Sequence, residues 1–483
     1  MHLTQEAEPN AVTATAPTEP LLQVNGLRVS FITRAGRIQA INDVSFEVSA
    51  GETFGLVGET GCGKSQTALA VMRLTPEAGI IERGKIQFAG ANLTDNIAHE
   101  FKIVQKKHGR VKLKRNKAAL KQLGQKINQI RGKDMSMIFQ EPMTSLNPVY
   151  TIGRQVSEVL LRHKVISLVD RILARNAATK EKLREITNAA ARDLSQAELR
   201  ELLQQAGLEG LEDQVWFALS RKDIGATQKI RTINNLSERK IKPITFRFLV
   251  RLKESKGQIP GEYRILNKIP IVRRWLSGVL EKEALEVSYE LLSVVNMPNA
   301  ANVLTSYPHE LSGGMRQRVM IAMAISTKPK LVIADEPTSA LDVTVQAQIL
   351  ELLRELKRTF NSAILFISHD IGVVSEICDR VGVMYAGNLV EVARLDELFA
   401  DAKHPYTQGL FASIPKYGEK RELLQTIEGT VPNLINPPTG CRFRTRCTRA
   451  FEKCSQPPPW LEVEQGHGVL CWLYGDSEKH VNQ

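Results

Sequence analysis

The 483-residue chain lacks a hydrophobic run long enough to cross a membrane. No stretch approaches the roughly 18 consecutive apolar residues that a membrane-spanning helix needs. The first twenty residues are rich in Thr, Ala, Pro and Glu, and no basic start is followed by an apolar run, so they do not form a secretory signal. We interpret residues 1–20 as a disordered tail. These absences predict a cytoplasmic protein that reaches a membrane only through partners.

Acidic residues are missing from one segment and scarce in another. Phe101 to Lys133 contains twelve Lys or Arg and no acidic residue, and Arg221 to Arg274 contains fifteen basic and four acidic residues. The whole chain carries a net charge of +12, so the remainder is acidic. The two basic segments suit contact with anionic lipid headgroups or with membrane partners. A solvated surface is the alternative. Nucleic acid is a weaker option, because no interleaved aromatic residues accompany the charge, and no nucleic-acid partner is predicted.

A phosphate-binding loop is the first chemical motif. Residues 58–65 read GETGCGKS, between an apolar run at 53–57 that predicts a buried strand and a predicted helix from Lys64 to Met72. Glycines let successive N–H groups turn inward toward phosphate oxygens, and a helix N-terminus favours anions. Lys64 should reach the β- and γ-phosphates of a nucleotide, and the Ser65 hydroxyl should bind Mg²⁺. The predicted nucleotide contacts are Gly58, Glu59, Thr60, Gly61, Cys62, Gly63, Lys64, Ser65 and Gln66.

Two further predicted strands end in polar residues. The strand at 331–334 is followed by Asp335 and Glu336, and the strand at 363–367 is followed by Ser368 and His369. An Asp at the carboxyl end of a parallel strand can hold the Mg²⁺ shell. Glu336 is placed to polarise an attacking water, and His369 is a candidate contact for the γ-phosphate. Asp-Glu at a strand end is otherwise a common turn signal, and a lone His is more often structural.

Taken together, these motifs resemble the ATP-binding cassette (ABC) family over about residues 22–161 and 286–400. The resemblance implies three further roles. Gln140, in IFQEP, would contact Mg²⁺ and the attacking water. Ser312, Gly313 and Gly314, in LSGGMRQR, would close over the γ-phosphate bound by an opposite subunit. Asp342, in SALD, would belong to the loop that faces that subunit.

The predicted fold class is α/β, an ABC-type P-loop nucleotide-binding domain with an enlarged helical subdomain and a small cysteine-containing extension. The ATPase domain is expected at 21–161 and 286–400, with a basic insertion at about 95–133. A mainly helical region is expected at 162–285, including a helix at 197–205 with leucines on one face. The extension is expected at 401–483.

Few aromatic residues are available for adenine stacking, which the family places upstream of the phosphate loop. Phe46 lies in an alternating strand pattern with Val44 and Val48 and is predicted to be core. Phe31 is the better candidate, with strand packing as its alternative. Ile38 is a third possibility for the stacking position.

Four of the six cysteines, Cys441, Cys447, Cys454 and Cys471, fall near the end of the chain. Cytosolic thiols rarely form structural disulfides, so a metal is the first suspicion. The close pairs typical of zinc sites are absent, and four thiolates could instead hold an iron–sulfur cluster or remain unconnected. Cys62 should contribute only backbone to the phosphate loop, and Cys378 follows an apolar helix pattern and is predicted to be core.

Two stretches of the C-terminal sequence make the resemblance more specific. HPYTQGLFASIP from His404 and PPTGCRF from Pro437 resemble the extension of ATP-binding subunits in oligopeptide, dipeptide and nickel importers. Met315, where the wider family most often has Gln, is typical of this branch. Members of the branch can carry a [4Fe-4S] cluster on cysteines that match Cys441, Cys447, Cys454 and Cys471.

The resemblance implies an ATPase, using ATP and Mg²⁺, that powers a peptide importer from the cytoplasmic face of the inner membrane. Nickel or another small solute is the main rival cargo. Since only one set of motifs is present, a second ATP-binding subunit is expected, together with two permease subunits and an extracytoplasmic solute-binding protein. Two other classes stay open: a soluble ABC ATPase acting on nucleic acid, and a regulatory subunit that binds nucleotide without turnover. The presence of both Glu336 and His369 argues against a regulatory subunit without turnover.

Overall fold

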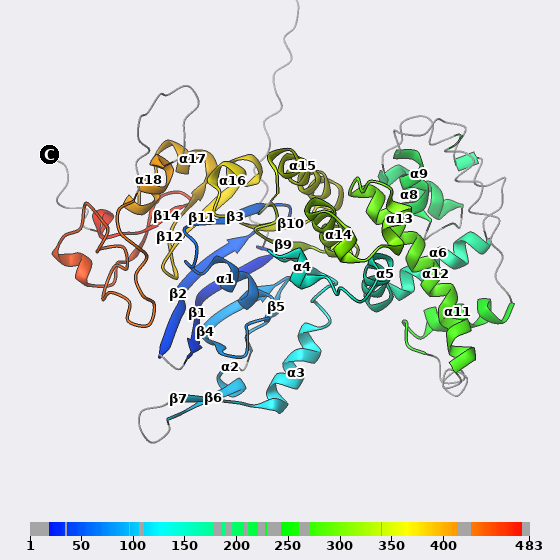
Figure 1. The fold of residues 1–483 in the computed structure, drawn as a ribbon, viewed down its shortest axis with the longest axis horizontal. Coiled ribbons are helices and arrows are strands. Elements are labelled where there is room, and N and C mark those ends of the chain that lie inside the picture. The colour runs from blue at the N-terminus through cyan, green and yellow to red at the C-terminus, as the bar shows by residue number, and fades with distance from the viewer. Residues whose placement is uncertain are drawn as a thin grey trace, which may run out of the picture. The chain divides into compact units, whose positions relative to one another are not determined.

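The computed structural model divides the chain into two compact units, and each is described by itself (Figure 1). The first unit falls within Met1–Ile127 and Ala363–Gln483, and the second within Asn128–Ser362. The described residues are 19–33, 36–95, 97–105, 111–177, 185, 186, 188, 196–206, 208, 211–220, 228, 243–259, 270–339, 341–413 and 427–475. The predicted tail at 1–20 lies almost entirely outside them, as does much of the second basic segment. The predicted domain boundaries remain predictions.

The first unit contains a mixed sheet built around the buried strand β3 (Thr53–Val57). Strand β3 pairs in parallel with β10 (Ala363–Ile367) on one side and with β11 (Arg380–Tyr385) on the other. The next strands are antiparallel, in the order β11, β12 (Asn388–Arg394), β14 (His467–Leu470) and β13 (Trp460–Glu464). The predicted strands at 53–57 and 363–367 are thereby confirmed. Every residue of β3 and β10 is buried, as expected for central parallel strands.

A second sheet of the first unit is antiparallel, in the order β2 (Arg37–Val48), β1 (Leu22–Ile32), β4 (Gly79–Phe88) and β5 (Ala91–Asn92). Phe46 of β2 is 7% exposed and stacks on Phe54 with ring centroids 5.3 Å apart, so the prediction that Phe46 is core is confirmed. The remaining elements of this unit are α1 (Lys64–Val71), α2 (Ile97–Glu100), β6 (Phe101–Gln105), β7 (Val111–Arg115), α3 (Lys117–Ile127), α16 (Ile371–Ile377), α17 (Leu395–Ala400), α18 (Pro405–Ala412), η5 (Glu452–Ser455) and η6 (Trp472–Tyr474).

Strands β6 and β7 form an antiparallel hairpin within the first basic segment, next to α2 and α3 (Figure 1). Some basic side chains of this segment form contacts within the protein. Arg115 donates to the carbonyl oxygens of Glu77 and Gly79 at 2.6 and 2.8 Å, and Lys126 pairs with Asp95 at 2.9 Å. Helix α3 also exposes basic side chains, so the segment combines anchoring with a charged surface.

The second unit pairs β8 (Met135–Ile138) in parallel with β9 (Leu331–Asp335), and every residue of both strands is buried. Its long helix α15 (Val343–Phe360) buries Ile349, Leu352 and Leu356 on one face. The other elements of this unit are α4 (Pro142–Ser145), α5 (Ile152–His163), α6 (Val165–Ala177), α8 (Gln196–Gln205), α9 (Glu212–Ser220), α11 (Pro243–Glu254), α12 (Pro270–Val294), α13 (Ala300–Thr305), η4 (Pro308–Glu310) and α14 (Gly313–Ile325).

The helical region contains α8 where a helix at 197–205 was predicted, with Leu199 and Leu203 fully buried. Buried ion pairs join α6 to α12. Arg171 lies 3.1 Å from Glu283, and Arg175 lies 2.8 Å from the same carboxylate, with all three side chains nearly inaccessible. Buried charges are tolerated only when paired, so these contacts fix how the two helices align. None of the described helices is long and apolar enough to cross a bilayer.

Candidate nucleotide-binding site

The phosphate loop connects β3 to α1, as the sequence predicts. The backbone of Gly58 has φ +145°, and Gly63, which precedes α1, has φ +109°. A β-carbon at Gly58 would lie 2.1 Å from the carbonyl oxygen of Met384, and one at Gly63 would lie 2.8 Å from that of Ala40. Both positions therefore require glycine, both for backbone conformation and for space.

Lys64 extends across this loop. Its ammonium donates to the carbonyl oxygens of Gly58 at 2.7 Å and Glu59 at 3.2 Å, and the residue is 4% exposed. A buried ammonium with only neutral partners would gain a charged partner from a phosphate. Beside it, burial raises the pKa of the Cys62 thiol, whose residue is fully inaccessible. That Cys62 contributes only backbone to nucleotide binding stays a prediction.

The loop offers an open face to a ligand. Thr60 and Gly61 are exposed, and Ser65 and Gln66 are half-buried at the start of α1. The first turn of α1 is anchored by Thr67, whose hydroxyl donates to the carbonyl of Gly63 at 3.0 Å. Backbone N–H groups at a helix start and a lysine in one loop make an anion-binding site of the type that holds nucleotide phosphates.

The second unit brings together two of the predicted catalytic residues. The Gln140 side-chain amide donates to the Glu336 carboxylate at 2.8 Å, although 196 positions separate them. Asp335 ends β9 and is 4% exposed, while Glu336 follows it with φ +47°, a conformation uncommon outside glycine. Backbone strain of this kind is often found at functional sites. The Gln140 amide and the Glu336 carboxylate therefore lie side by side, just after strands β8 and β9.

Three predicted contacts of the opposite subunit's nucleotide, Ser312, Gly313 and Gly314, lie at a helix start in the same unit. Ser312 caps α14, since its hydroxyl accepts from the N–H of Met315 at 3.3 Å, and Ser312 and Gly313 are exposed. Gly314 is half-buried, and a β-carbon there would lie 2.9 Å from the Val345 side chain. Asp342 is likewise exposed and caps α15 by accepting from the N–H of Val345 at 2.9 Å.

His369 follows β10 in the first unit and is exposed. The next residue, Asp370, caps α16 by accepting from the N–H of Gly372 at 2.8 Å. Cys378, which follows that helix, is 6% exposed, so its prediction as core is confirmed. Phe31 is half-buried and pairs with Ile38 on β2 and Gly79 on β4, so both stacking candidates lie side by side.

The four C-terminal cysteines lie in the extension. The Cys441 N–H donates to the carbonyl of Cys454 at 3.0 Å, which brings these two segments together. Burial raises the pKa of Cys441, of Cys447 and of Cys471, the last to about 11. The donor set fits an iron–sulfur cluster in kind. Within the described ranges, however, no three His, Cys, Asp or Glu side chains form a group that could hold a metal ion.

The extension is attached to the sheet through Glu391, a fully buried carboxylate on β12. It accepts from the N–H groups of Lys403 and His404 at 2.6 and 2.9 Å and lies 2.8 Å from the His467 ring. His404 in turn caps α18 by accepting from the N–H of Tyr406 at 3.0 Å. The sequence reasoning missed this network, because nothing marks Glu391 as buried among the strand residues.

Burial lowers the pKa of His404 to about 3, from 6.5 for a free side chain. Between these values the unfolded chain binds a proton that the folded chain does not, so stability falls as pH drops below about 6.5, by up to about 1.4 kcal/mol per pH unit. We expect His404→Asn, which keeps a capping acceptor, to flatten the dependence of melting temperature on pH between pH 6 and pH 5. The exposed His309→Asn is the matched control. If the melting temperature of His404→Asn changed with pH as steeply as that of wild type, His404 would not be the source of the pH dependence.

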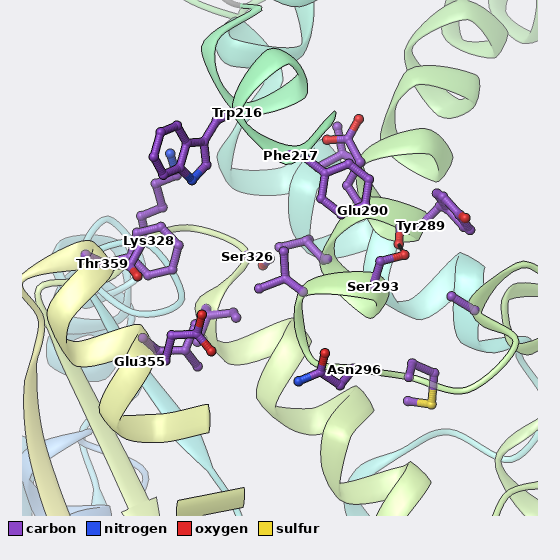
Figure 2. Close-up of a pocket in the computed structure, with 18 of the residues that line it drawn as sticks. Trp216, Phe217, Tyr289, Glu290, Ser293, Asn296, Ser326, Lys328, Glu355 and Thr359 are labelled. Atoms are coloured by element: carbon purple, nitrogen blue, oxygen red, sulfur yellow. Dashed lines mark hydrogen bonds between the residues drawn. The ribbon is translucent and has the colours of Figure 1, made fainter. Parts of the chain in front are cut away.

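A cavity of about 1140 Å³ lies elsewhere in the second unit (Figure 2). Its lining includes Trp216 and Phe217 of α9, Tyr289 and Glu290 of α12, and Lys328. Glu290 is held by Arg171 at 2.8 Å. None of the residues predicted to bind nucleotide lines this cavity, so it is separate from the site described above.

Comparison with known proteins shows the family of this chain. The family described as ABC transporter matches residues 41–240 and 251–339, and that described as Oligopeptide/dipeptide transporter, C-terminal region, matches residues 390–454. The chain therefore belongs to the ABC transporter family, in the branch of ATP-binding subunits that carries this C-terminal region.

Two relatives align over nearly the whole chain. The oligopeptide transport ATP-binding protein AppD of Bacillus subtilis is 36% identical, covering 95% of this chain and 98% of its own. The oligopeptide transport ATP-binding protein OppD of Salmonella typhimurium is 35% identical, covering 96% of each. Among solved structures, the dimeric ABC transporter cassette MJ0796 is 16% identical, with a TM-score of 0.43, and covers 77% of this chain and 98% of its own.

Proposed function

We propose that this chain is the ATP-hydrolysing subunit of an ABC importer for di- or oligopeptides. The observation that carries the proposal is the phosphate loop, a glycine-dependent turn that holds Lys64 buried among carbonyl oxygens. Relatives named for oligopeptide transport, aligned over 95% of the chain, favour peptide over nickel as cargo. The protein would lie at the cytoplasmic face of the inner membrane, bound to two permease subunits and served by a solute-binding protein.

In the proposed reaction the phosphate loop binds the triphosphate of ATP. Lys64 would neutralise the β- and γ-phosphates, and Mg²⁺ would be held by the Ser65 hydroxyl and the Gln140 side chain, with Asp335 supporting its shell. Glu336, oriented by its 2.8 Å contact with Gln140, would accept a proton from the attacking water. His369 would contact the γ-phosphate.

A second ATP-binding subunit completes the proposed site. Ser312 and Gly313 are exposed at the start of α14. The N-terminus of a helix favours binding of an anion. We assign to this tip the γ-phosphate bound by the neighbouring subunit, with Asp342 at the same contact. Closure of the pair around ATP would move the permease subunits, and hydrolysis would reset them.

Reconstitution with permease partners tests the proposed cargo. The chain, its ATPase partner and the permeases are placed in proteoliposomes with a solute-binding protein, and ATP-driven movement of a labelled peptide is measured. We expect transport that needs ATP and is not competed by nickel. ATP-driven movement of nickel without peptide movement would contradict the choice of cargo and leave the ATPase assignment in place.

We also propose that Cys441, Cys447, Cys454 and Cys471 hold a [4Fe-4S] cluster when iron and sulfide are supplied. Support comes from the four thiols that the extension supplies and from the 3.0 Å backbone contact that joins the segments of Cys441 and Cys454. Protein purified without oxygen should contain iron and acid-labile sulfide in equal amounts, and Cys447→Ser should lose both. Cys378→Ser, in the core, is the control. Colourless, iron-free protein from anaerobic preparation would contradict the proposal.

A further inference from the structure

The C-terminal extension contacts the phosphate loop directly. The Glu59 carboxylate accepts two hydrogen bonds from Arg446, from Nη1 at 2.9 Å and from Nη2 at 3.2 Å. The Arg446 side chain is 6% exposed and that of Glu59 is 26% exposed, so the pair is largely shielded from water. A bidentate Arg–carboxylate pair of this kind is among the stronger and more directional polar contacts in proteins.

Other groups hold the Arg446 guanidinium in place. Its Nε donates to the carbonyl of Glu428 at 2.8 Å, and Nη2 also donates to the carbonyl of Ile427 at 3.1 Å. Nη1 additionally lies 3.4 Å from the Tyr385 hydroxyl. With its donors engaged on several sides, Arg446 has little freedom to follow Glu59 if the loop shifts. It acts as a fixed point for the loop.

A second contact reaches the same part of the loop. The Glu59 N–H donates to the Tyr406 hydroxyl at 3.0 Å. The rings of Tyr385 and Tyr406 both pack against Phe443, with centroids 5.1 and 5.4 Å from it. Phe443 and Arg446 lie between Cys441 and Cys447, so the cysteine-containing segment supports Glu59 through both its backbone and its carboxylate.

A third contact acts through the turn that follows β11. Arg442, the residue after Cys441, donates to the carbonyl of Ala386 and to the Gln39 side chain at 2.8 Å. The neighbouring Gly387 N–H donates to the carbonyl of Cys62 at 2.8 Å. The extension therefore supports the phosphate loop at Glu59 and, through this turn, at Cys62.

We propose that Arg446 is a positioning residue for the phosphate loop, through which the C-terminal extension sets the affinity for ATP. The inference rests on the proposed function. Two effects of losing Arg446 act in the same direction. The loop loses a fixed point, and the Glu59 carboxylate is left without its partner in the loop that receives the negatively charged triphosphate.

Arg446→Ala in the full chain tests the proposal. We expect the Kd for MgATP to rise by about 5-fold or more, the lower end of the range typical of coupling between two sites. The KM for ATP of the assembled transporter should rise equally, with kcat at saturating ATP within about twofold of wild type. Arg449→Ala, an exposed arginine two residues after Cys447, is the matched control and should leave the Kd unchanged.

Glu59→Gln separates positioning from general support of the fold. If Arg446 acts through the Glu59 carboxylate, Arg446→Ala should weaken ATP binding much less in the Glu59→Gln background than in wild type. An equal loss in both backgrounds, or no loss in wild type, would overturn the proposal. Should Arg446→Ala fail to fold, Arg446→Gln is judged by the same two criteria. Wild-type protein that binds no MgATP would instead refute the proposed function.

Discussion

Replacing Glu336 with Gln should lower the ATPase rate of the assembled transporter by about 100-fold or more and leave ATP bound. A positioned general base contributes roughly 10²- to 10⁴-fold to a rate, and the amide that replaces the carboxylate cannot accept the proton of the attacking water. The amide oxygen can still accept the hydrogen bond that Gln140 donates at 2.8 Å, so the local structure should persist. ATP turnover and retained nucleotide are measured on the same preparation.

The matched control for this change is Glu351→Gln on α15. Glu351 is exposed and pairs with Arg354 at 2.8 Å, an exposed contact of a kind that contributes little to stability. Its loss should leave turnover unchanged. Hydrolysis by Glu336→Gln at the wild-type rate would remove Glu336 from the role of base. A regulatory subunit without turnover would be recognised by wild-type protein that binds ATP and does not hydrolyse it in the intact complex.

Replacing Gly58 with Ala should lower the affinity for MgATP by about tenfold or more, because the loop cannot keep its conformation. At φ +145° an alanine is strained, and its β-carbon would lie 2.1 Å from the Met384 carbonyl oxygen and 3.0 Å from the Cys62 sulfur. The first separation is shorter than real contacts allow, so the backbone must move. Nucleotide binding and thermal unfolding are measured together.

Substitutions at two other glycines distinguish the effect of backbone strain from the effect of a steric conflict. Gly61, in the same loop, has φ +81°, and Gly90, after β4, has φ +78°, and a β-carbon at either would meet nothing within 4 Å. Gly90→Ala should lower stability by about 1 kcal/mol and leave ATP affinity unchanged. Gly61→Ala should weaken ATP binding less than Gly58→Ala. Equal affinity of Gly58→Ala and wild type would show that this turn does not shape the phosphate site.

Local patterns predicted the local parts of the site. Strand β3 has the bounds expected from its apolar run, and α1 begins at Lys64 as the loop motif requires. Phe46 and Cys378 were assigned to the core from alternation and helical periodicity, and both are buried. These features depend on neighbours in the sequence, where period and glycine placement carry the information.

Long-range polar contacts could not be predicted from the same patterns. Arg446 and Glu59 are 387 positions apart, and neither residue type nor spacing links them. Glu391 is fully buried between apolar neighbours in the middle of β12, and its partners come from two later segments. A single sequence records which charges exist but not which of them meet, because pairing depends on the tertiary fold.

Calorimetric titration can show whether the loop around Lys64 binds the triphosphate of MgATP. The titration compares Glu336→Gln protein with the Lys64→Ala, Glu336→Gln double variant, so that hydrolysis does not disturb either measurement. We expect saturable binding in the first protein and at least a 100-fold weaker affinity in the second, because a buried charge-assisted contact with the phosphates is lost. Equal affinity in the two proteins would show that Lys64 does not bind the triphosphate.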